Sequence, residues 1–213
     1  MTSTQQLPRK LNLGCGKYKL PGYLNVDSWP EAQPDMFFDL EKLPLPFQDN
    51  FFEEARADHV LEHLTNPFAV MLELHRICQA GALVKIKVPH FSRGMTHSDH
   101  KRCFDLSFPY FFNPRFHVGF LGCRMDLIKQ RLRWFGQPYF KKSVMPRGLY
   151  WLGLSAGAII DVLANLSPIL CSRVWCFWVG GFEEYEMHFR VVKTTETAGL
   201  TDSPAQHQRL REE

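Results

Sequence analysis

The segment from Lys10 to Asp27 restricts the possible folds of this chain more than any other part of the sequence. It reads K-L-N-L-G-C-G-K-Y-K-L-P-G-Y-L-N-V-D, so a short apolar strand runs directly into a G-C-G turn at 14–16. Glycines directly after a strand let the backbone turn tightly and let a ligand approach it closely. A second short strand, 23–26, ends at Asp27, whose carboxylate can accept hydrogen bonds from the hydroxyl groups of a ribose. This pattern predicts an open α/β sheet that binds a nucleoside-containing ligand across the ends of its strands.

The spacing within this segment disfavours a dinucleotide. A dinucleotide-binding fingerprint has three glycines that open a full helix, with an acidic residue about 20 positions further on. Here two glycines form the turn with no third in phase, and Asp27 follows Gly16 by only eleven positions. The segment from Cys15 to Gly22 is shorter than the dozen or so residues of an ordinary crossover, and Pro21 interrupts any first helix. NAD and FAD are therefore weaker candidates than a smaller nucleoside ligand.

Length and composition indicate one globular domain with room for an insertion. The chain has 213 residues and a formal net charge of +3, which is too small to indicate nucleic acid by itself. Six cysteines are scattered without C-x-x-C spacing, which favours a reducing compartment over a disulfide framework or a zinc cluster. The first ten residues lack the apolar core of a signal peptide, so we expect a cytoplasmic protein.

The chain resembles the class I S-adenosylmethionine-dependent methyltransferases, specifically the type 11-like branch that begins L-N-L-G-C-G and continues to G-Y-x-N-V-D. The resemblance extends from Lys10 to Lys193 and is closest up to Phe91. It implies a Rossmann-like α/β fold with a mostly parallel seven-stranded sheet, a C-terminal antiparallel hairpin, and S-adenosyl-L-methionine as the cofactor. It also implies cofactor contacts from Gly14, Cys15, Gly16, Asp27, Asp39, Leu40 and His59.

Two of these contacts lie at the end of a third short strand, 36–40. In the family that the chain resembles, an acidic residue followed by an apolar one caps the adenine ring, and Asp39 and Leu40 match that pair. The alternative is a turn aspartate followed by an ordinary core residue.

A fourth strand, 54–58, leads into D-H-V-L-E-H-L at 58–64. Open α/β sheets bind ligands outside the carboxyl ends of their strands, so His59 is expected to line the cofactor pocket and His63 to be structural. A histidine pair at this spacing can bind a metal, but no third ligand lies at a suitable spacing, so no metal site is expected. Asn66 and Pro67 then predict a helix that ends at Gly81, followed by a fifth strand over 82–88.

The polar segment after the fifth strand contains the candidate catalytic residues. An oxygen nucleophile needs a base, and imidazole is the usual one near neutral pH, so His90 and His100 are candidates, with Asp99 orienting an imidazole. The family pattern here is D-P-x-H-K-R, and His97 stands where that pattern has aspartate. The alternative is a polar loop whose histidines only form hydrogen bonds. Three cations suit an anionic substrate such as a phosphate or carboxylate: Arg93, Lys101 and Arg102.

The carboxyl-terminal third is predicted to contain the antiparallel strand pair, over 120–132 and 185–193, separated by an insert at about 138–182. The apolar run at 149–178 is interrupted by polar residues and a proline, so we do not expect it to span a membrane. It could instead form a helical lid over the substrate pocket, or a surface that touches a membrane through Trp151, Trp175, Phe177 and Trp178. Residues 194–213 are expected to be disordered.

The function that these patterns predict is methyl transfer to a small-molecule or sugar- or lipid-linked hydroxyl acceptor. One alternative is a non-catalytic S-adenosylmethionine-binding or partner protein, and another is a nucleotide-sugar or dinucleotide enzyme on a similar sheet. A nucleic-acid methyltransferase is disfavoured by the modest charge and by the lack of a basic stripe and of an N-P-P-Y-like motif. The sequence leaves open the acceptor, the methylated atom, the oligomeric state, the role of the insert, and which of His90 and His100 is the base.

Overall fold

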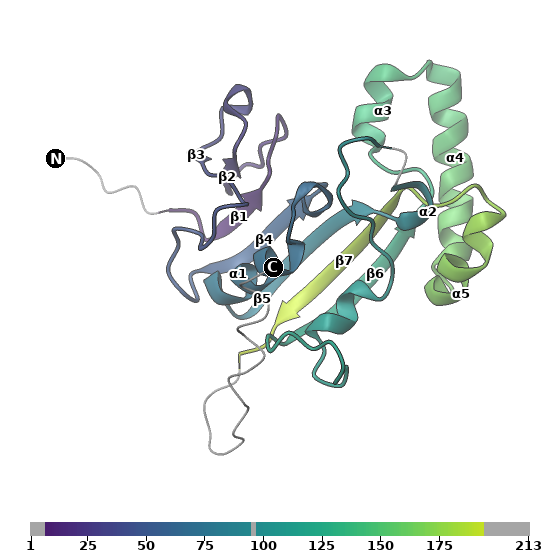
Figure 1. Cartoon of the computed structure of the whole chain (residues 1–213). Coiled ribbons are helices and arrows are strands. Elements are labelled where there is room, and N and C mark those ends of the chain that lie inside the picture. Colours follow the sequence, from purple (N-terminus) through teal and green to yellow (C-terminus); the bar gives the residue numbers. More distant parts are fainter. Residues whose placement is uncertain (1–6, 95–96, 194–213) are drawn as a thin grey trace.

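One seven-stranded sheet organises the protein in the computed structural model, which describes residues 7–94 and 97–193 (Figure 1). The spatial order of the strands is β3-β2-β1-β4-β5-β7-β6. The strands are β1 (Lys10–Leu13), β2 (Leu24–Asp27), β3 (Met36–Phe37), β4 (Phe52–Asp58), β5 (Cys78–Pro89), β6 (Met125–Arg133) and β7 (Glu184–Val191).

All neighbouring strands are parallel except β7, which lies antiparallel between β5 and β6. The predicted mostly parallel sheet with an antiparallel carboxyl-terminal pair is therefore confirmed. Strands β1, β2 and β3 lie in sequence order toward one edge of the sheet. The chain then crosses back, so that β4 pairs with the other side of β1. The carboxyl ends of β1 and β4 thus meet at a topological switch point, where open α/β sheets bind their ligands.

The crossovers on the β1–β3 side are short, as the length of the glycine segment predicted. The chain between β1 and β2 contains only turns, and the chain between β2 and β3 contains a single 3₁₀ turn, η1 (Pro30–Ala32). A buried polar contact stabilises the first connection: Asn12 Nδ2 donates to Asn25 Oδ1 at 2.9 Å, and that oxygen also accepts from the Leu20 N–H at 2.8 Å.

Helix α1 (Pro67–Ile77) connects β4 to β5. Its N-cap is Asn66, whose Oδ1 accepts a hydrogen bond from the Ala69 N–H at 3.1 Å. The helix ends at Ile77 rather than at the predicted Gly81, because Cys78 already pairs with Phe52 as the first residue of β5. Gly81 instead lies within β5 with φ of +81°, at an irregularity in the pairing with β4.

The predicted insert is helical and joins β6 to β7. It comprises α3 (Pro138–Val144), α4 (Arg147–Ala164), α5 (Pro168–Arg173) and the 3₁₀ turn η4 (Trp175–Phe177). Figure 1 shows α3 and α4 projecting beyond the end of the sheet at which β5 runs into α2 (Phe91–Gly94). The insert therefore lies at the carboxyl ends of the parallel strands, where the ligand site is expected.

Polar contacts attach the insert to the sheet. Asp161 Oδ1 accepts from the Trp134 N–H at 2.7 Å, and the Asn165 side chain bonds both the N–H and the carbonyl oxygen of Leu132 at 2.9 Å. Gly157 allows close packing here, since a Cβ at that position would lie 2.7 Å from the Cβ of Phe135. The carboxyl-terminal segment that was predicted to be disordered, 194–213, lies outside the described residues.

Candidate functional site

The glycine turn after β1 is held against the end of β2. Gly14 and Gly16 have φ of +60° and +48°, a region that L side chains rarely adopt. A Cβ at Gly14 would lie 2.3 Å from Val60 Cγ2, whereas a Cβ at Gly16 would meet nothing within 4 Å. Gly14 therefore serves packing, and Gly16 leaves open space beside the backbone.

Asp27 is fixed by this turn. Its Oδ2 accepts from the Gly16 N–H at 2.7 Å, and its Oδ1 accepts from the Trp29 N–H at 2.8 Å. Each carboxylate oxygen keeps a second lone pair, so both can accept a further hydrogen bond from a ligand.

Three cavities adjoin one another at this edge of the sheet. We name them by one residue each: the Asp27 cavity (about 440 Å³), the Asp58 cavity (about 390 Å³) and the His100 cavity (about 380 Å³). Gly14 and Gly16 line the first two, Gln137 and Phe140 line the last two, and His59 lines all three. His59 is thus the point at which the three spaces meet.

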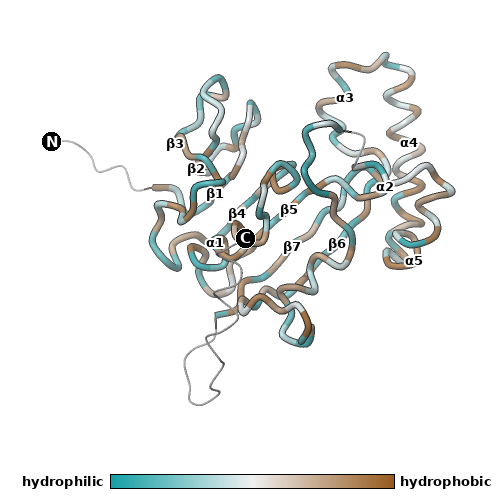
Figure 2. Tube along the Cα trace, viewed as in Figure 1, coloured by the Kyte–Doolittle hydropathy of each residue, from teal (hydrophilic) through white to brown (hydrophobic). Residues whose placement is uncertain are grey.

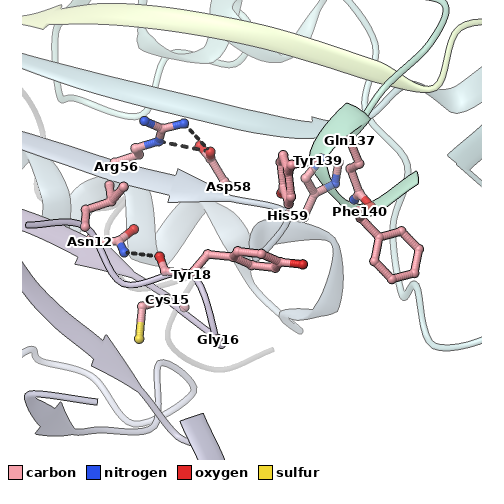
Figure 3. A pocket seen from close by; sticks show the side chains of 12 residues that line it. Asn12, Cys15, Gly16, Tyr18, Arg56, Asp58, His59, Gln137, Tyr139 and Phe140 are labelled. Atoms are coloured by element: carbon pink, nitrogen blue, oxygen red, sulfur yellow. Dashed lines mark hydrogen bonds and ion pairs between the residues drawn. The ribbon is translucent and has the colours of Figure 1, made fainter. Parts of the chain in front are cut away.

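The Asp58 cavity lies between the glycine turn and helix α3. Figure 3 shows Tyr18 and Tyr139 approaching it from these two elements, and their ring centroids are 4.7 Å apart. Arg56 donates to Asp58 Oδ2 through Nε at 2.9 Å and through Nη2 at 2.6 Å. The other oxygen, Oδ1, is buried and accepts no hydrogen bond from the described residues. A buried carboxylate oxygen beside a cavity is a natural acceptor for a cationic ligand group.

His59 is held in a strained backbone conformation between two buried carboxylates. Its φ is +56°, its Nε2 lies 2.9 Å from Glu184 Oε2, and its Nδ1 lies 3.3 Å from Glu62 Oε1. Burial alone would lower the pKa of this imidazolium, but the hydrogen bond to Glu184 and the contact with Glu62 outweigh burial and raise that pKa to about 9. A protonated His59 therefore forms a wall of the three cavities and is not available as a base near neutral pH.

The structure brings together the residues that the sequence predicted to contact a cofactor. Six of them line the Asp27 cavity: Gly14, Gly16, Asp27, Asp39, Leu40 and His59. The seventh, Cys15, lines the Asp58 cavity with its side chain buried. Asp39 Oδ1 also accepts from the Glu41 N–H at 3.0 Å, a turn contact of the kind that the alternative interpretation expected. Both interpretations of Asp39 are compatible with this geometry.

His90 does not belong to the site, which corrects its predicted role as a base. It is fully buried and lines none of the three cavities. Its Nδ1 lies 2.7 Å from Ser92 Oγ and its Nε2 lies 2.9 Å from Ser172 Oγ, so it connects the end of β5 to α5. Burial lowers the pKa of His90 to about 4, although the charge of Asp105 opposes this shift.

The other two catalytic candidates lie at the His100 cavity with two further histidines. Asp99 contacts His97 Nδ1 through Oδ1 and lies 3.3 Å from His63 Nδ1 through Oδ2. The His100 ring lies 5.1 Å from that of His63 and 4.9 Å from that of His97, measured between centroids. His63 and His97 were not predicted as site residues, and the H-S-D-H pattern beside E-H is the sequence signal that could have identified them.

The three predicted substrate cations lie in different places. Arg93 lines the His100 cavity and pairs with Glu183 at 2.9 Å. Lys101 faces the Asp27 cavity and contacts Glu41 Oε1 at 3.0 Å. Arg102 donates to the Thr65 carbonyl oxygen at 2.7 Å and lines a separate hollow beside Phe68. The three side chains thus line three different hollows, and their role toward an anionic substrate stays a prediction.

The insert contributes site residues that the sequence could not identify. Gln137 and Phe140 line two cavities, and Lys141 reaches the His100 cavity and pairs there with Glu183. Helix α3 thus forms one wall of the site, which is the position that a lid would take.

Comparison with known proteins places the fold. No protein-family model and no curated protein matches the chain, but solved structures do. An S-adenosylmethionine-dependent methyltransferase from Archaeoglobus fulgidus is 14% identical with a TM-score of 0.51, over 86% of each chain. Phosphoethanolamine N-methyltransferase 2 from Haemonchus contortus, solved with S-adenosyl-L-methionine, is 11% identical with a TM-score of 0.50, over 90% of this chain and 50% of that one.

The [4+2]-cyclase SpnF is also similar, at 13% identity and a TM-score of 0.51, over 90% of this chain and 78% of its own. Together with the strand order, these structures show that the chain has the Rossmann-like fold of class I methyltransferases. Identity this low shows the fold alone, and the cyclase illustrates that one fold supports more than one reaction.

Proposed function

We propose that this protein binds S-adenosyl-L-methionine and transfers its methyl group to a hydroxyl acceptor. The observation that carries the proposal is the pair of adjoining cavities at the switch point between β1 and β4, the Asp27 and Asp58 cavities, both lined by Gly16. The L-N-L-G-C-G and G-Y-x-N-V-D motifs support the finer proposal that the chain belongs to the type 11-like branch.

The residues of both cavities fit such a cofactor. Gly16 leaves the space that a side chain would fill, and the carboxylate of Asp27 keeps lone pairs for the two ribose hydroxyls. The buried Asp58 Oδ1, which accepts no hydrogen bond from the described residues, suits the ammonium group of the methionine part. Asp39 and Leu40 would border the adenine.

The bound cofactor would supply a sulfonium methyl group. With that group bound, an electron pair of the acceptor oxygen would form the new bond to carbon as the carbon–sulfur bond breaks, and the acceptor proton would pass to water. The chain's own residues contribute mainly by positioning, which supplies much of the rate in a displacement of this kind. The His100 cavity adjoins both cofactor cavities through His59, so it is the proposed acceptor site.

Calorimetric titration with S-adenosylhomocysteine tests the cofactor, with NAD and UDP-glucose as parallel ligands. We expect binding of the first alone, and Asp27→Ala to weaken it about tenfold to a hundredfold because two hydrogen bonds to a charged acceptor are lost. Asp126→Ala is the matched control, since Asp126 is half-exposed on β6 and its one ion pair among the described residues is with Arg124. Undiminished binding by Asp27→Ala, or a preference for NAD or UDP-glucose, would refute the proposed cofactor site.

Turnover is a separate question, because a non-catalytic cofactor-binding protein would pass the same titration. Incubation with labelled S-adenosylmethionine and a panel of sugar and lipid-linked alcohols should transfer label to at least one acceptor. Binding without transfer to any acceptor of the panel would favour the non-catalytic alternative.

A further inference from the structure

The first inference concerns the group of histidines and carboxylates at the His100 cavity. One carboxylate oxygen of Glu62, one ring nitrogen of His63 and one of His100 lie within 4.8 Å of one another. A second group, formed by His97, Asp99 and His100, meets the same criterion and shares His100 with the first. Backbone hydrogen bonds hold the two segments together, because the Lys101 N–H donates to the Glu62 carbonyl oxygen at 2.9 Å.

Glu62 supplies an independent sign that a cation belongs here. Its side chain is completely buried, yet neither carboxylate oxygen forms a hydrogen bond with the described residues. His59 Nδ1 lies 3.3 Å from Oε1 and provides one cationic neighbour without hydrogen-bond geometry, whereas Oε2 has neither a hydrogen bond nor an ion pair with the described residues. A buried carboxylate with unsatisfied oxygens is costly unless a cation or a donor completes its surroundings.

We propose that Glu62, His63 and His100 bind a divalent first-row transition metal ion. Carboxylate and imidazole ligands suit Mn²⁺, Fe²⁺, Co²⁺ and Zn²⁺. Ligand atoms around one such ion are about 3 to 4 Å apart, so small side-chain rotations bring these three into place. Asp99, 3.3 Å from His63 Nδ1, orients that ring as a second partner often does for a metal-bound histidine.

The proposed ion refines the acceptor class, and this part rests on the proposed function. Three protein ligands leave coordination positions that face the cavity, where two adjacent oxygens of an acceptor can bind. The ion lowers the pKa of the bound hydroxyl group, whose proton passes to water at the exposed side near His97. The acceptor is then a vicinal diol or a hydroxy acid. Because His90 lines none of the three cavities, an ion that lowers the pKa of the acceptor hydroxyl would remove the need for a side-chain base.

Co²⁺ titration tests the site without any assay of turnover. We expect one Co²⁺ per chain, a visible absorption band typical of nitrogen and oxygen ligands, and at least tenfold weaker binding by His63→Ala and by His100→Ala. His117→Ala is the control, because His117 is an exposed histidine that lines none of the three cavities.

The same samples are titrated with S-adenosylhomocysteine. His100 does not line the Asp27 or Asp58 cavity, so His100→Ala should bind this ligand as the unchanged protein does, which also reports correct folding. Absence of Co²⁺, Mn²⁺ and Zn²⁺ binding, or binding that both histidine variants retain, overturns the metal site. If the unchanged protein does not bind S-adenosylhomocysteine, the proposed function is overturned instead.

A second inference rests on a different observation, the outer face of α4. Its exposed residues recur every three or four positions and form one continuous face, whereas the buried ones, Tyr150, Gly157, Asp161 and Ala164, form the opposite stripe. Beyond the charged Arg147 at its start, the outward face carries no charge. It contains Leu149, Trp151, Leu152, Ser155, Ala158, Ile159, Val162 and Leu163. Exposed apolar residues continue over α5, η4 and the residue after it: Ile169, Leu170, Phe177 and Trp178. Figure 2 shows hydrophobic stretches along the trace of α4 and α5.

The charges of the insert indicate what covers this face. Between 138 and 182 the sole acidic residue is Asp161, which is buried, while Lys142 near the end of α3 and Arg147 at the start of α4 are exposed. A second copy of the chain, packed symmetrically, would bring like charges together, whereas anionic lipid headgroups would complement them. Exposed tryptophans at the edge of an apolar surface are also typical of proteins at membrane interfaces.

We propose that α4 and α5 lie on an anionic lipid bilayer, with α4 parallel to the surface. α4 is the one helix of the described residues that is long and apolar enough to cross a membrane, at 18 residues or about 27 Å. However, its inner stripe packs on Trp134 and Phe135, and Asp161 bonds the Trp134 N–H. These contacts favour a helix that stays attached to the protein and inserts only its outer face.

Co-sedimentation with vesicles tests this surface. We expect binding to an equimolar mixture of phosphatidylcholine and phosphatidylglycerol, with a blue shift of tryptophan fluorescence, and weak binding to phosphatidylcholine alone. Leu152→Glu and Arg147→Glu should each reduce binding at least tenfold, whereas Ile128→Glu, at an exposed apolar position on β6, should leave it unchanged. Equal binding of all variants, or a dimer that Leu152→Glu dissociates in sedimentation velocity, overturns the proposal.

Discussion

Helices α1 and α4 are both amphipathic, but they bury opposite kinds of face. α1 buries Val70, Met71, Leu74 and Ile77 in the core of the sheet and leaves its polar residues outside. α4 buries Tyr150, Asp161 and two small residues, and leaves most of its large apolar side chains exposed. The comparison shows that periodicity reveals two faces of a helix but not which of them the protein covers.

The energetics of the two helices should differ accordingly. Burial of apolar area holds α1, while the insert depends on a few polar contacts, through Asp161, Asn165 and the bond between His90 and Ser172. Apolar burial responds to loss of volume, and polar contacts respond to loss of a partner or to protonation. Four predictions separate the two cases.

The largest effect is expected at Leu74 of α1. Leu74 is 0% exposed, so Leu74→Ala should lower the free energy of unfolding by about 2 to 5 kcal/mol through lost burial and a residual cavity. Urea unfolding followed by circular dichroism measures it. A loss below about 1 kcal/mol would contradict the picture of α1 as a core helix.

As the pH falls, the packing of the insert on the sheet should weaken at a higher pH than the packing of α1 on the sheet. Because burial holds the pKa of His90 near 4, below its ordinary value of about 6.5, the neutral ring contributes stability that is present above pH 6.5 and is lost as the pH falls toward 4. The loss should approach about 3 kcal/mol. Unfolding of the unchanged protein and of His90→Gln across this range measures it, and equal pH dependence in both would contradict the assignment.

Asp161→Ala should cost about 1 to 3 kcal/mol, because it leaves the Trp134 N–H without its acceptor and removes one of the two carboxylates that Arg133 contacts. Asp126→Ala, which removes an exposed carboxylate from an exposed ion pair, should change stability by less than about 0.5 kcal/mol. Equal losses in the two variants would mean that Asp161 does not attach the insert.

The smallest effect is expected at Leu152 of α4. Leu152 is 67% exposed, so Leu152→Ala should change the free energy of unfolding by less than about 0.5 kcal/mol. Leu152→Ala is the same substitution as Leu74→Ala, made on an exposed helix face instead of a buried one. A loss above 1 kcal/mol in dilute solution would indicate that a partner already covers this face.

Much of the fold and one side of the site could be predicted because their signals are local. Gly14, Gly16 and Asp27 lie within one strand–turn–strand segment, and their types and spacing follow from backbone conformation. The helix boundary at Gly81 was misplaced because pairing between Cys78 and Phe52 outweighed a local stop signal.

The acceptor side could not be predicted in the same way, since it depends on the packing of distant segments. His90 and Arg93 follow the same strand, yet one faces α5 and the other faces the His100 cavity. Gln137 and Lys141 come from an insert whose position no local pattern specifies. The direction in which a side chain leaves a strand end is set by what packs there, not by its own type.

The register of β6 and β7 has a consequence for how such a protein could arise. Arg133 faces Glu184 at the last pair of the ladder, so the whole of 134–183 enters and leaves the sheet at a single place, as the loop of a β-hairpin does. Closing a longer loop there instead of a tight turn costs only about 2 kcal/mol in chain entropy. The strand order therefore does not depend on the insert, and a protein with a short turn between β6 and β7 would have the same sheet. In evolution, this segment could be replaced together with its cavity wall and its outward apolar face, while the sheet stays unchanged.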